Sequence, residues 1–421
     1  MKIRQLKDNK IIVLLYHQFR SLMRIAKRQT PAVPSFLSMT LDYDDVSIAK
    51  QMLSKQPNWY DEKIVKKFEN TFARWNGSKY AFAFIQGRVA LSAAIYALQI
   101  KPEDEVIIPA YTCISVMNSL AFDKINIVYC DIELDTFGLD VNRLKEKITN
   151  KTKAIILHHL YGLVCRDYEA IISLAKKCNI RVIEDCTHST GAKYNGIRVG
   201  NRGDISFYSS GASKVFNTIA GGIVATNDAS LAAGLEQYYD KTPFPDLASV
   251  KKHLRNIILD YYQYKHHLSW LWGDFVELLF GRARVAMSTE DEKNGVKPSL
   301  YRQRMPAALA LIGLNQLKKI DKYNQIRRKN ANRWDLWAKN NGYKKPLIVK
   351  GSVPVFLMYP LLVEPKKKQI RSWGPKKLGV EIGIVFGENC YTKKIKGCPN
   401  TDTVINQVIN LPTLLGESVS S

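Results

Sequence analysis

Short apolar runs alternate with helix-length amphipathic segments between residues 79 and about 228. The helical segments, with apolar positions three and four residues apart, include Arg88–Leu98, Asp167–Lys177 and Ala229–Tyr239. The apolar runs are expected strands: Tyr80–Ile85, Glu105–Ile108, Asn126–Cys130, Ala154–His158, Arg181–Glu184, Ile205–Tyr208 and Gly222–Thr226. Repeated strand–helix–strand units predict an α/β fold with a mostly parallel sheet covered on both faces. In such sheets the ligand site lies beyond the carboxyl ends of the strands.

The pattern changes between residues 235 and 300. The stretch His253–Phe280 mixes aromatic and aliphatic residues with Lys and His, which predicts one or two amphipathic helices. Such helices suit packing on the body of the protein or at a subunit interface. They also suit a membrane surface, because Trp and basic residues are common there. The same two interpretations apply to the N-terminal stretch Ile11–Arg28.

A polar helix is expected over Pro306–Lys339, leading into a smaller C-terminal α/β domain. Candidate strands there are Val353–Leu357 and Val380–Val385, and a terminal helix is expected to be short or absent. The expected division is a basic, amphipathic N-terminal segment at 1–55, a large ligand-binding domain at 56–320 with an aromatic insertion at about 235–300, and a small domain at 321–421.

The chain is strongly basic, with 62 Lys plus Arg against 38 Asp plus Glu and a net charge of +24. Such a field attracts nucleic acids, anionic membranes or phosphorylated substrates. Scattered lysines on a solvated surface explain the charge equally well. No helix-turn-helix or other nucleic-acid module is recognisable in the sequence, so we expect no nucleic-acid partner.

The seven cysteines are isolated, without a CxxC pair, which favours a reducing compartment without disulfides or a bound metal. The apolar stretch Ile11–Tyr16 is too short for a secretory signal, and no run of 18 apolar residues occurs. We therefore expect a cytoplasmic protein, and leave open peripheral contact with the inner membrane surface.

The candidate chemistry lies just after strand candidates. The run Arg181-Val-Ile-Glu-Asp185 delivers Asp185 to the carboxyl end of a buried strand. An aspartate there either caps the next turn or pairs with a pyridinium nitrogen and keeps it protonated. Lys214 follows another strand by one small-residue loop and precedes Gly221-Gly222. A lysine desolvated at a sheet edge becomes a Schiff-base nucleophile, and Ser209 can bind a phosphate.

A third element is Gln86-Gly-Arg88, between a strand and the start of a helix. Gly87 permits close approach of the backbone, and the free amides of a helix N-terminus suit a phosphate. Together the three elements require a ligand with a phosphate, a ring nitrogen and an aldehyde. Pyridoxal 5'-phosphate (PLP) is that ligand.

At this point the sequence resembles the PLP-dependent sugar aminotransferases of the DegT/DnrJ/StrS type. The resemblance is strong over residues 60–230 and moderate over 300–340. It rests on these stretches, in order: Lys101-Pro-Glu-Asp-Glu-Val-Ile-Ile-Pro109, Asp131-Ile-Glu-Leu-Asp-Thr136, His159-Leu-Tyr-Gly162, Val182-Ile-Glu-Asp185, His188-Ser-Thr-Gly-Ala192, and Gly203-Asp204 ahead of Lys214. It implies the aspartate-aminotransferase-like fold, type I of the PLP-dependent transferases, with a smaller C-terminal α/β domain.

The resemblance also implies roles for single residues. Lys214 would hold the cofactor as a Schiff base and move the proton between cofactor and substrate carbons. Asp185 would pair with the pyridine nitrogen, and His188 would contact the ring or its phenolic oxygen. Ser209, with the amides of Gly87 and Arg88, would hold the phosphate.

Three departures from the family pattern affect these roles. Many members stack an aromatic residue on the ring where this chain has Cys113, so either Cys113 makes a thinner contact or Tyr111 turns in. Many members supply an Asn to the partner subunit's phosphate where this chain has Arg302, a charged substitute. Ala220 replaces an acidic residue before the paired glycines. His159 and Tyr161 are either substrate contacts or structural residues, and neither is included in the predicted site.

The expected function is transfer of an amino group from L-glutamate or glutamine to a keto group of a nucleotide-linked sugar, in surface polysaccharide or glycan biosynthesis. A homodimer is expected by analogy with this fold. The alternatives are a PLP-dependent sugar dehydratase or lyase, for which Cys390 and Cys398 are the weak candidate thiols, and a non-catalytic regulator of the same fold bound to membrane.

Overall fold

The computed structural model describes residues 40–55, 58–265, 294–298, 301–386 and 395–415, together with Phe19, Leu22, Met23 and Glu292. A sheet of seven strands forms its centre, in the order β1-β9-β8-β5-β4-β2-β3. The strands are β1 (Tyr80–Phe84), β2 (Glu105–Pro109), β3 (Asn126–Cys130), β4 (Thr152–His158), β5 (Arg181–Asp185), β8 (Ile205–Ser209) and β9 (Gly222–Thr226). Only β9 runs antiparallel to its neighbours in this sheet. All seven predicted strands are therefore confirmed, with ends that differ by at most two residues.

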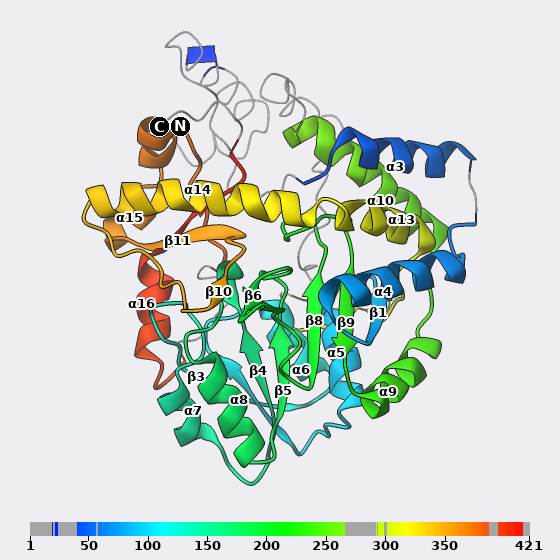
Figure 1. Ribbon diagram of the computed structural model, residues 1–421, viewed down its shortest axis with the longest axis horizontal. Helices are drawn as coiled ribbons and strands as arrows, with labels where there is room; N and C mark the ends of the chain where they lie inside the picture. The colour runs from blue at the N-terminus through cyan, green and yellow to red at the C-terminus, as the bar shows by residue number, and fades with distance from the viewer. Residues whose placement is uncertain are drawn as a thin grey trace.

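Helices cover both faces of this sheet (Figure 1). They are α4 (Glu62–Asn76), α5 (Gly87–Ala97), α6 (Ile114–Phe122), α7 (Val141–Lys147), α8 (Tyr168–Lys177) and α9 (Ala229–Asp240). The strands between them are almost wholly apolar and buried, as expected for strands packed on both sides. The prediction of an α/β fold with a mostly parallel sheet is confirmed.

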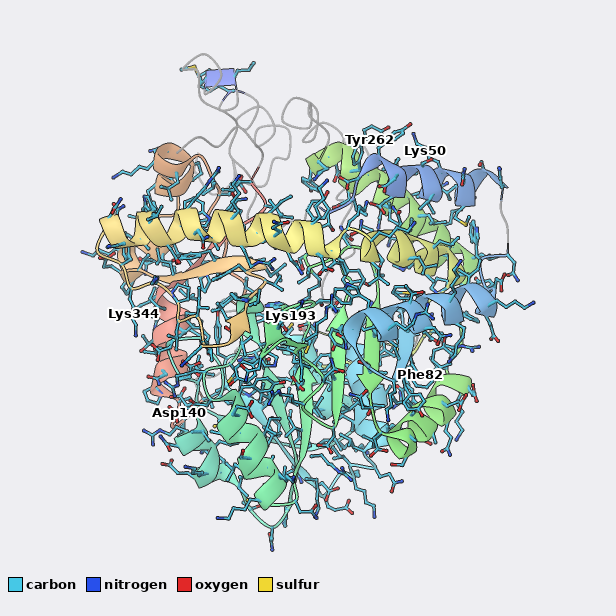
Figure 2. The ribbon with its side chains drawn as sticks, in the orientation of Figure 1. Lys50, Phe82, Asp140, Lys193, Tyr262 and Lys344 are labelled. Atoms are coloured by element: carbon cyan, nitrogen blue, oxygen red, sulfur yellow. The ribbon has the colours of Figure 1, made fainter. Side chains whose placement is uncertain are left out.

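Helix α3 (Tyr43–Lys55) packs on α10 (Leu247–Asp260) and α13 (Ala307–Leu317), so the chain before residue 56 contributes to the body of the protein. Asp45, buried in α3, accepts hydrogen bonds from Lys319 Nζ at 2.6 Å and Gln316 Nε2 at 2.7 Å. Lys50 lies beside Tyr262 (Figure 2), which belongs to the π-helical turn η2 (Tyr261–Lys265) after α10.

The predicted helices within His253–Phe280 lie only partly in the described chain. Helix α10 and η2 account for that part, and residues 266–291 lie outside the described residues, as does Ile11–Tyr16. Helix α10 buries Val250, Leu254 and Ile257 against the body, which favours the packed interpretation for this portion. Among the described residues, no helix is both long and apolar enough to cross a bilayer.

The single helix expected over Pro306–Lys339 is wrong, because two helices, α13 and α14 (Ile320–Asn340), meet at Lys318–Lys319. Helix α13 is apolar and buried nearly all round, whereas α14 is polar and buries one face only. The two helices follow one another along the body (Figure 1), and the break between them separates a buried apolar helix from a largely exposed polar one.

The strand expected at Val353–Leu357 is also wrong. Ser352–Val353 forms the short β10 beside β6 (Lys193–Tyr194), and the main strand β11 begins only at Met358 and ends at Leu362. The reason is Phe356, whose φ of 54° lies in the left-handed region and interrupts an extended chain.

The strand expected at Val380–Val385 is reduced to isolated bridge residues, Val380 and Gly383, the latter paired with Asn410. The Asn410 side chain, which accepts from Val385 N at 3.0 Å, replaces a continued ladder. Helix α16 (Pro399–Gln407) is short, and β12 (Val408–Pro412), which was not expected, follows it and pairs with β11. A second apolar core forms between β11, β12 and α14.

Glu69 of α4 is a buried carboxyl group in the main body. Burial raises its pKa to about 7, although Ala83 N donates to it at 2.8 Å. The unfolded chain releases this proton near pH 4.5, so the folded chain binds one more proton between about pH 4.5 and 7. The free energy of unfolding therefore falls as pH rises through this window, by about 3 kcal/mol in total.

We expect Glu69→Gln to remove this loss, because the amide oxygen still accepts from Ala83 N. The difference in unfolding free energy between the variant and the natural protein should shift in favour of the variant by up to about 3 kcal/mol from pH 5 to pH 8. Denaturant titration at both pH values measures this difference. Glu62→Gln, at an exposed position of the same helix, is the control. Parallel pH curves for the Glu69 variant and the natural protein would contradict the prediction.

Candidate active site

The carboxyl ends of β4, β5 and β8 meet at one edge of the sheet. His158, Asp185 and Ser209 are the last residues of these strands, and His158 and Asp185 are directly paired in the register. Asp185 is buried, and its Oδ1 accepts from Thr187 N at 2.9 Å. The predicted position of Asp185 is therefore observed, with its carboxylate held at the rim of the sheet.

Lys214 lies in the loop between β8 and β9. The loop is tightly bonded: Lys214 N donates to Gly211 O at 2.9 Å, and Thr218 N donates to Ser210 O at 2.8 Å. Burial lowers the pKa of Lys214 from its ordinary value, and the charge of Arg88 adds to this effect, whereas Cys113 and Asp185 oppose it. A buried amine with a lowered pKa is the state in which lysine acts as a nucleophile.

A pocket opens at this edge of the sheet. It is lined by Thr112, Cys113, His158, His159, Leu160, Asp185, Thr187, His188 and Phe386. Burial lowers the pKa of His188 well below its ordinary value, and the charges of Lys214 and His158 add to this. The His188 ring is therefore neutral, and it stacks on Phe386 with 5.9 Å between the ring centroids.

The structure shows how the chain is arranged where Cys113 replaces the aromatic residue of many family members. Cys113 lines the pocket, and Tyr111 lies behind it, fully buried, with its hydroxyl 2.8 Å from that of Tyr161. Of the two side chains, Cys113 therefore faces the pocket, whereas Tyr111 supports its wall through Tyr161 and Phe386.

Beside this pocket, three backbone segments approach closely enough to form a cradle for a phosphate. A Cβ atom at Gly222 would lie 2.2 Å from Gln86 O, and one at Gly87 would lie 3.1 Å from Ser209 Cβ. Gln86 gives α5 no side-chain cap, so the amides of the first helical turn are directed at this cradle together with the Ser209 hydroxyl. The residues present therefore fit the phosphate, ring nitrogen and aldehyde of PLP.

The structure brings most of the predicted site residues to this edge of the sheet: Gly87, Arg88, Cys113, Asp185, His188, Ser209 and Lys214. Arg302 is not among them. Its guanidinium pairs with Asp123 Oδ1 at 2.9 Å and lies over the Tyr238 ring, on the outer side of α6 and α9. A contact between Arg302 and cofactor would require a partner subunit.

Two residues of the site were not predicted. Phe386 belongs to a C-terminal stretch without a motif, and Glu292 belongs to the insertion, where its carboxylate forms an ion pair with Arg88. No pattern in the sequence connects either residue with the strand ends, since both arrive from segments remote from the motifs.

Behind the pocket, His159, Glu184 and Cys186 lie close enough together to suggest a metal site. However, both ring nitrogens of His159 are engaged, Nε2 with Glu184 at 3.1 Å and Nδ1 with Cys165 N at 3.2 Å. Glu184 also accepts from Tyr168 OH at 2.6 Å and from the amides of Gly200, Arg202 and Gly203. These hydrogen bonds explain the cluster as a structural network of the described residues.

The thiols proposed for a lyase receive no support from the described chain. Cys390 lies outside the described residues. Cys398 is buried at the start of α16, where burial and the Asp131 charge raise its pKa to about 11. A thiol with a raised pKa is a poor nucleophile at neutral pH.

Similar proteins fall into one class. GDP-perosamine synthase of Escherichia coli O157:H7 is 40% identical over 198 residues, which are 47% of this chain and 53% of that protein. The dTDP-3-amino-3,6-dideoxy-alpha-D-galactopyranose transaminase of Aneurinibacillus thermoaerophilus is 41% identical over 41% of this chain and 47% of its own. These alignments thus span about half the length of the curated relatives.

The solved structures agree with this. The aminotransferase from Psychrobacter cryohalolentis covers 90% of this chain and 93% of its own, with a TM-score of 0.69 and 26% identity. A Bacillus subtilis protein with bound PMP, at 21% identity and a TM-score of 0.68, shows the same fold around the amine form of this cofactor. The predictions of the fold and, for the family, of PLP as its cofactor are confirmed. Because the family pattern matches residues 42–248 and 278–417, the chain belongs to the DegT/DnrJ/EryC1/StrS aminotransferase family.

Proposed function

We propose that this protein transfers an amino group from L-glutamate or glutamine to a keto group of a nucleotide-linked sugar, with PLP as cofactor. The observation that carries the proposal is the placement of a half-buried lysine with a lowered pKa, Lys214, at the same edge of the sheet as Asp185 and the Gly87–Ser209 cradle. The relatives support the substrate class, since they are named for GDP-linked and dTDP-linked amino sugars.

In this proposal each residue of the site has its own role. The amides at the start of α5 and the Ser209 hydroxyl would hold the phosphate, and Lys214 would bind the aldehyde carbon. Asp185 would hold a proton on the ring nitrogen, while the neutral His188 and Cys113 would fix the ring between them. Bound PLP supplies an electron sink that stabilises the carbanion formed when the substrate loses a proton. Lys214 would also act as the base that moves this proton.

Two further features belong to the proposal and stay predictions. The enzyme would be a homodimer in the cytoplasm, with Arg302 of each chain at the subunit interface. Contact with the inner membrane surface would come from the basic exterior, since the net charge of +24 favours anionic surfaces.

The first test is an absorbance spectrum of the protein with added PLP, before and after L-glutamate. We expect a visible band that glutamate converts to the absorbance of the pyridoxamine form, and that a GDP-, dTDP- or UDP-linked keto-sugar then restores. A band that neither glutamate nor glutamine changes would contradict amino transfer and favour the dehydratase or lyase. Absence of any band would favour the non-catalytic regulator.

A further inference from the structure

Helix α14 carries two fully buried polar side chains, Asn324 and Arg327, three residues apart on one face of the helix. The helix crosses from the C-terminal strands to the body of the protein (Figure 1). Arg327 Nη1 donates to Asn324 Oδ1 at 2.9 Å. Arginine is rarely fully buried unless it is paired, yet the acceptors of Arg327 among the described residues are two neutral oxygens. The second of these oxygens lies next to the site.

Arg327 holds the backbone directly after Lys214. Its Nη2 donates to Val215 O at 2.9 Å. Burial lowers the pKa of Arg327 to about 9, so the group is still protonated at neutral pH, and this hydrogen bond is charge-assisted. On the other side, Lys214 N donates to Gly211 O at 2.9 Å. The backbone is therefore fixed both before and after the lysine.

The turn that follows Val215 is strained. Ile219, a β-branched residue, has a φ of 66°, in the left-handed region that such residues rarely adopt. Asn217 supports it, because its Oδ1 accepts from Ile219 N at 2.7 Å and its backbone N donates to Gln316 Oε1 of α13 at 3.2 Å. Backbone strain persists where the surrounding structure fixes it, and it concentrates at functional sites. Side chains of α13 and α14 thus hold this loop in one shape.

Asn324 connects Arg327 with a second segment of the site. Its Nδ2 donates to Thr190 O at 3.1 Å, two residues after His188 of the pocket. The approach is close, since a Cβ atom at Gly191, whose φ is 92°, would lie 2.7 Å from Asn324 Nδ2. The two side chains of α14 therefore bridge two segments that carry predicted site residues.

We propose that Arg327 is a positioning residue for Lys214, and that it acts by fixing the carbonyl group of Val215. Its guanidinium thereby sets the direction in which the lysine side chain enters the site. Asn324 orients Arg327 and keeps the lysine loop in place against the turn of His188. The inference deepens the proposed function and rests on it for the role of Lys214, whereas the contacts that carry it are independent of the reaction.

The test measures Lys214 in the protein without cofactor. The rate at which acetic anhydride acetylates this lysine is followed against pH by peptide mass spectrometry, with the exposed Lys241 as internal standard. The midpoint of the profile reports the pKa of the amine, which desolvation lowers. The other groups that act on it electrostatically, Cys113, Asp185 and Arg88, are the same in all variants.

We expect Arg327→Met to move the midpoint up, toward that of an exposed lysine. The methionine donates nothing to Val215 O, so the loop loosens and water reaches the amine. The acetylation rate at pH 7, relative to its plateau at high pH, should fall by about 3- to 10-fold. Arg327→Lys keeps a positive charge and a donor for Val215 O, and should show a smaller shift.

Asn330→Leu is the matched control for a merely structural effect. Asn330, also buried on α14, donates through Nδ2 to Thr413 O at 2.8 Å, in the C-terminal segment. This variant should lower the free energy of unfolding in a denaturant titration, as Arg327→Met does, and leave the midpoint of Lys214 unchanged. An unchanged midpoint in Arg327→Met, or an equal shift in Asn330→Leu, would indicate a purely structural arginine and overturn the proposal.

Asn324→Leu tests the orienting role and leaves the guanidinium in place, so it also decides the proposal if Arg327→Met does not fold. The midpoint of Lys214 should rise by less than in Arg327→Met, and the double variant should show no further shift, because both changes act through the same hydrogen bond. A midpoint equal to that of the natural protein, or additive shifts in the double variant, would overturn the orienting role.

These results are independent of amino transfer, because acetylation needs neither PLP nor an amino donor. A failure of the proposed function would instead appear as a visible PLP band that amino donors leave unchanged, whatever the acetylation profile of Lys214.

Discussion

The Lys214→Ala protein is expected to show no visible PLP band and to lose glutamate-dependent amino transfer. Loss of proton transfer alone should lower the rate by about 10²- to 10⁴-fold, and loss of the covalent attachment adds to this. The physical reason is the placement of Lys214, which is half-buried, has a pKa lowered by desolvation and interacts with the charges of Asp185 and Cys113. An alanine removes both the nucleophile and the base and fits the space that the lysine leaves.

The measurement is the absorbance titration with PLP, followed by the rate of amino transfer from L-glutamate. Lys241→Ala, which removes a lysine from an exposed position after α9, is the control and should match the natural protein. A normal band in Lys214→Ala would show that another lysine binds the cofactor. It would remove the central observation of the proposed function.

The large domain could be predicted from the sequence because its strands carry their signal locally. Gly222–Thr226 is buried at every position and Arg181–Asp185 at all but the first, so a short run of apolar residues marks each strand. Their order in the sheet could not be read in the same way. The antiparallel insertion of β9 between β1 and β8 depends on pairing with β1, whose residues lie more than a hundred positions away from β9.

The C-terminal part shows where local patterns fail. Val353–Leu357 is as apolar as a true strand, yet a left-handed Phe356 ends the extended chain, and pairing begins at Met358. The cause is tertiary: Val355 N donates to Gly162 O at 2.8 Å, which fixes this turn against the large domain. A propensity for strand was therefore overridden by a contact that the sequence does not display.

The site residues likewise differ in whether a local sequence pattern could predict them. Asp185, Ser209 and Lys214 follow strand candidates and could be found from the rule that ligands bind at carboxyl ends of strands. Phe386, which lines the pocket, and Glu292, which pairs with Arg88, could not be found in this way because both come from distant segments without a motif. Arg88 was predicted for its amide, whereas its buried guanidinium and ion pair became visible only in three dimensions.

Asp185 is the second residue on which the proposed chemistry depends. Its carboxylate is held by Thr187 N at 2.9 Å and stands at the end of β5, paired in register with His158. Asp204, which directly precedes β8, provides a matched carboxylate beside the start of β5, at the end of this strand away from Asp185. It accepts from Val182 N at 2.7 Å and from Arg181 at 2.6 Å, far along β5 from the pocket.

We expect Asp185→Asn to lower the rate of amino transfer by roughly 10²- to 10³-fold while the visible PLP band persists. An asparagine oxygen still accepts from Thr187 N, so the loop keeps its shape, but a neutral amide cannot stabilise a proton on the ring nitrogen. Asp204→Asn removes the same charge away from the pocket and should leave the rate unchanged. Single-turnover conversion with L-glutamate, followed at the band, measures the effect directly. If both variants lost the same fraction of activity, the loss would come from the fold, and Asp185 would have no role at the ring nitrogen.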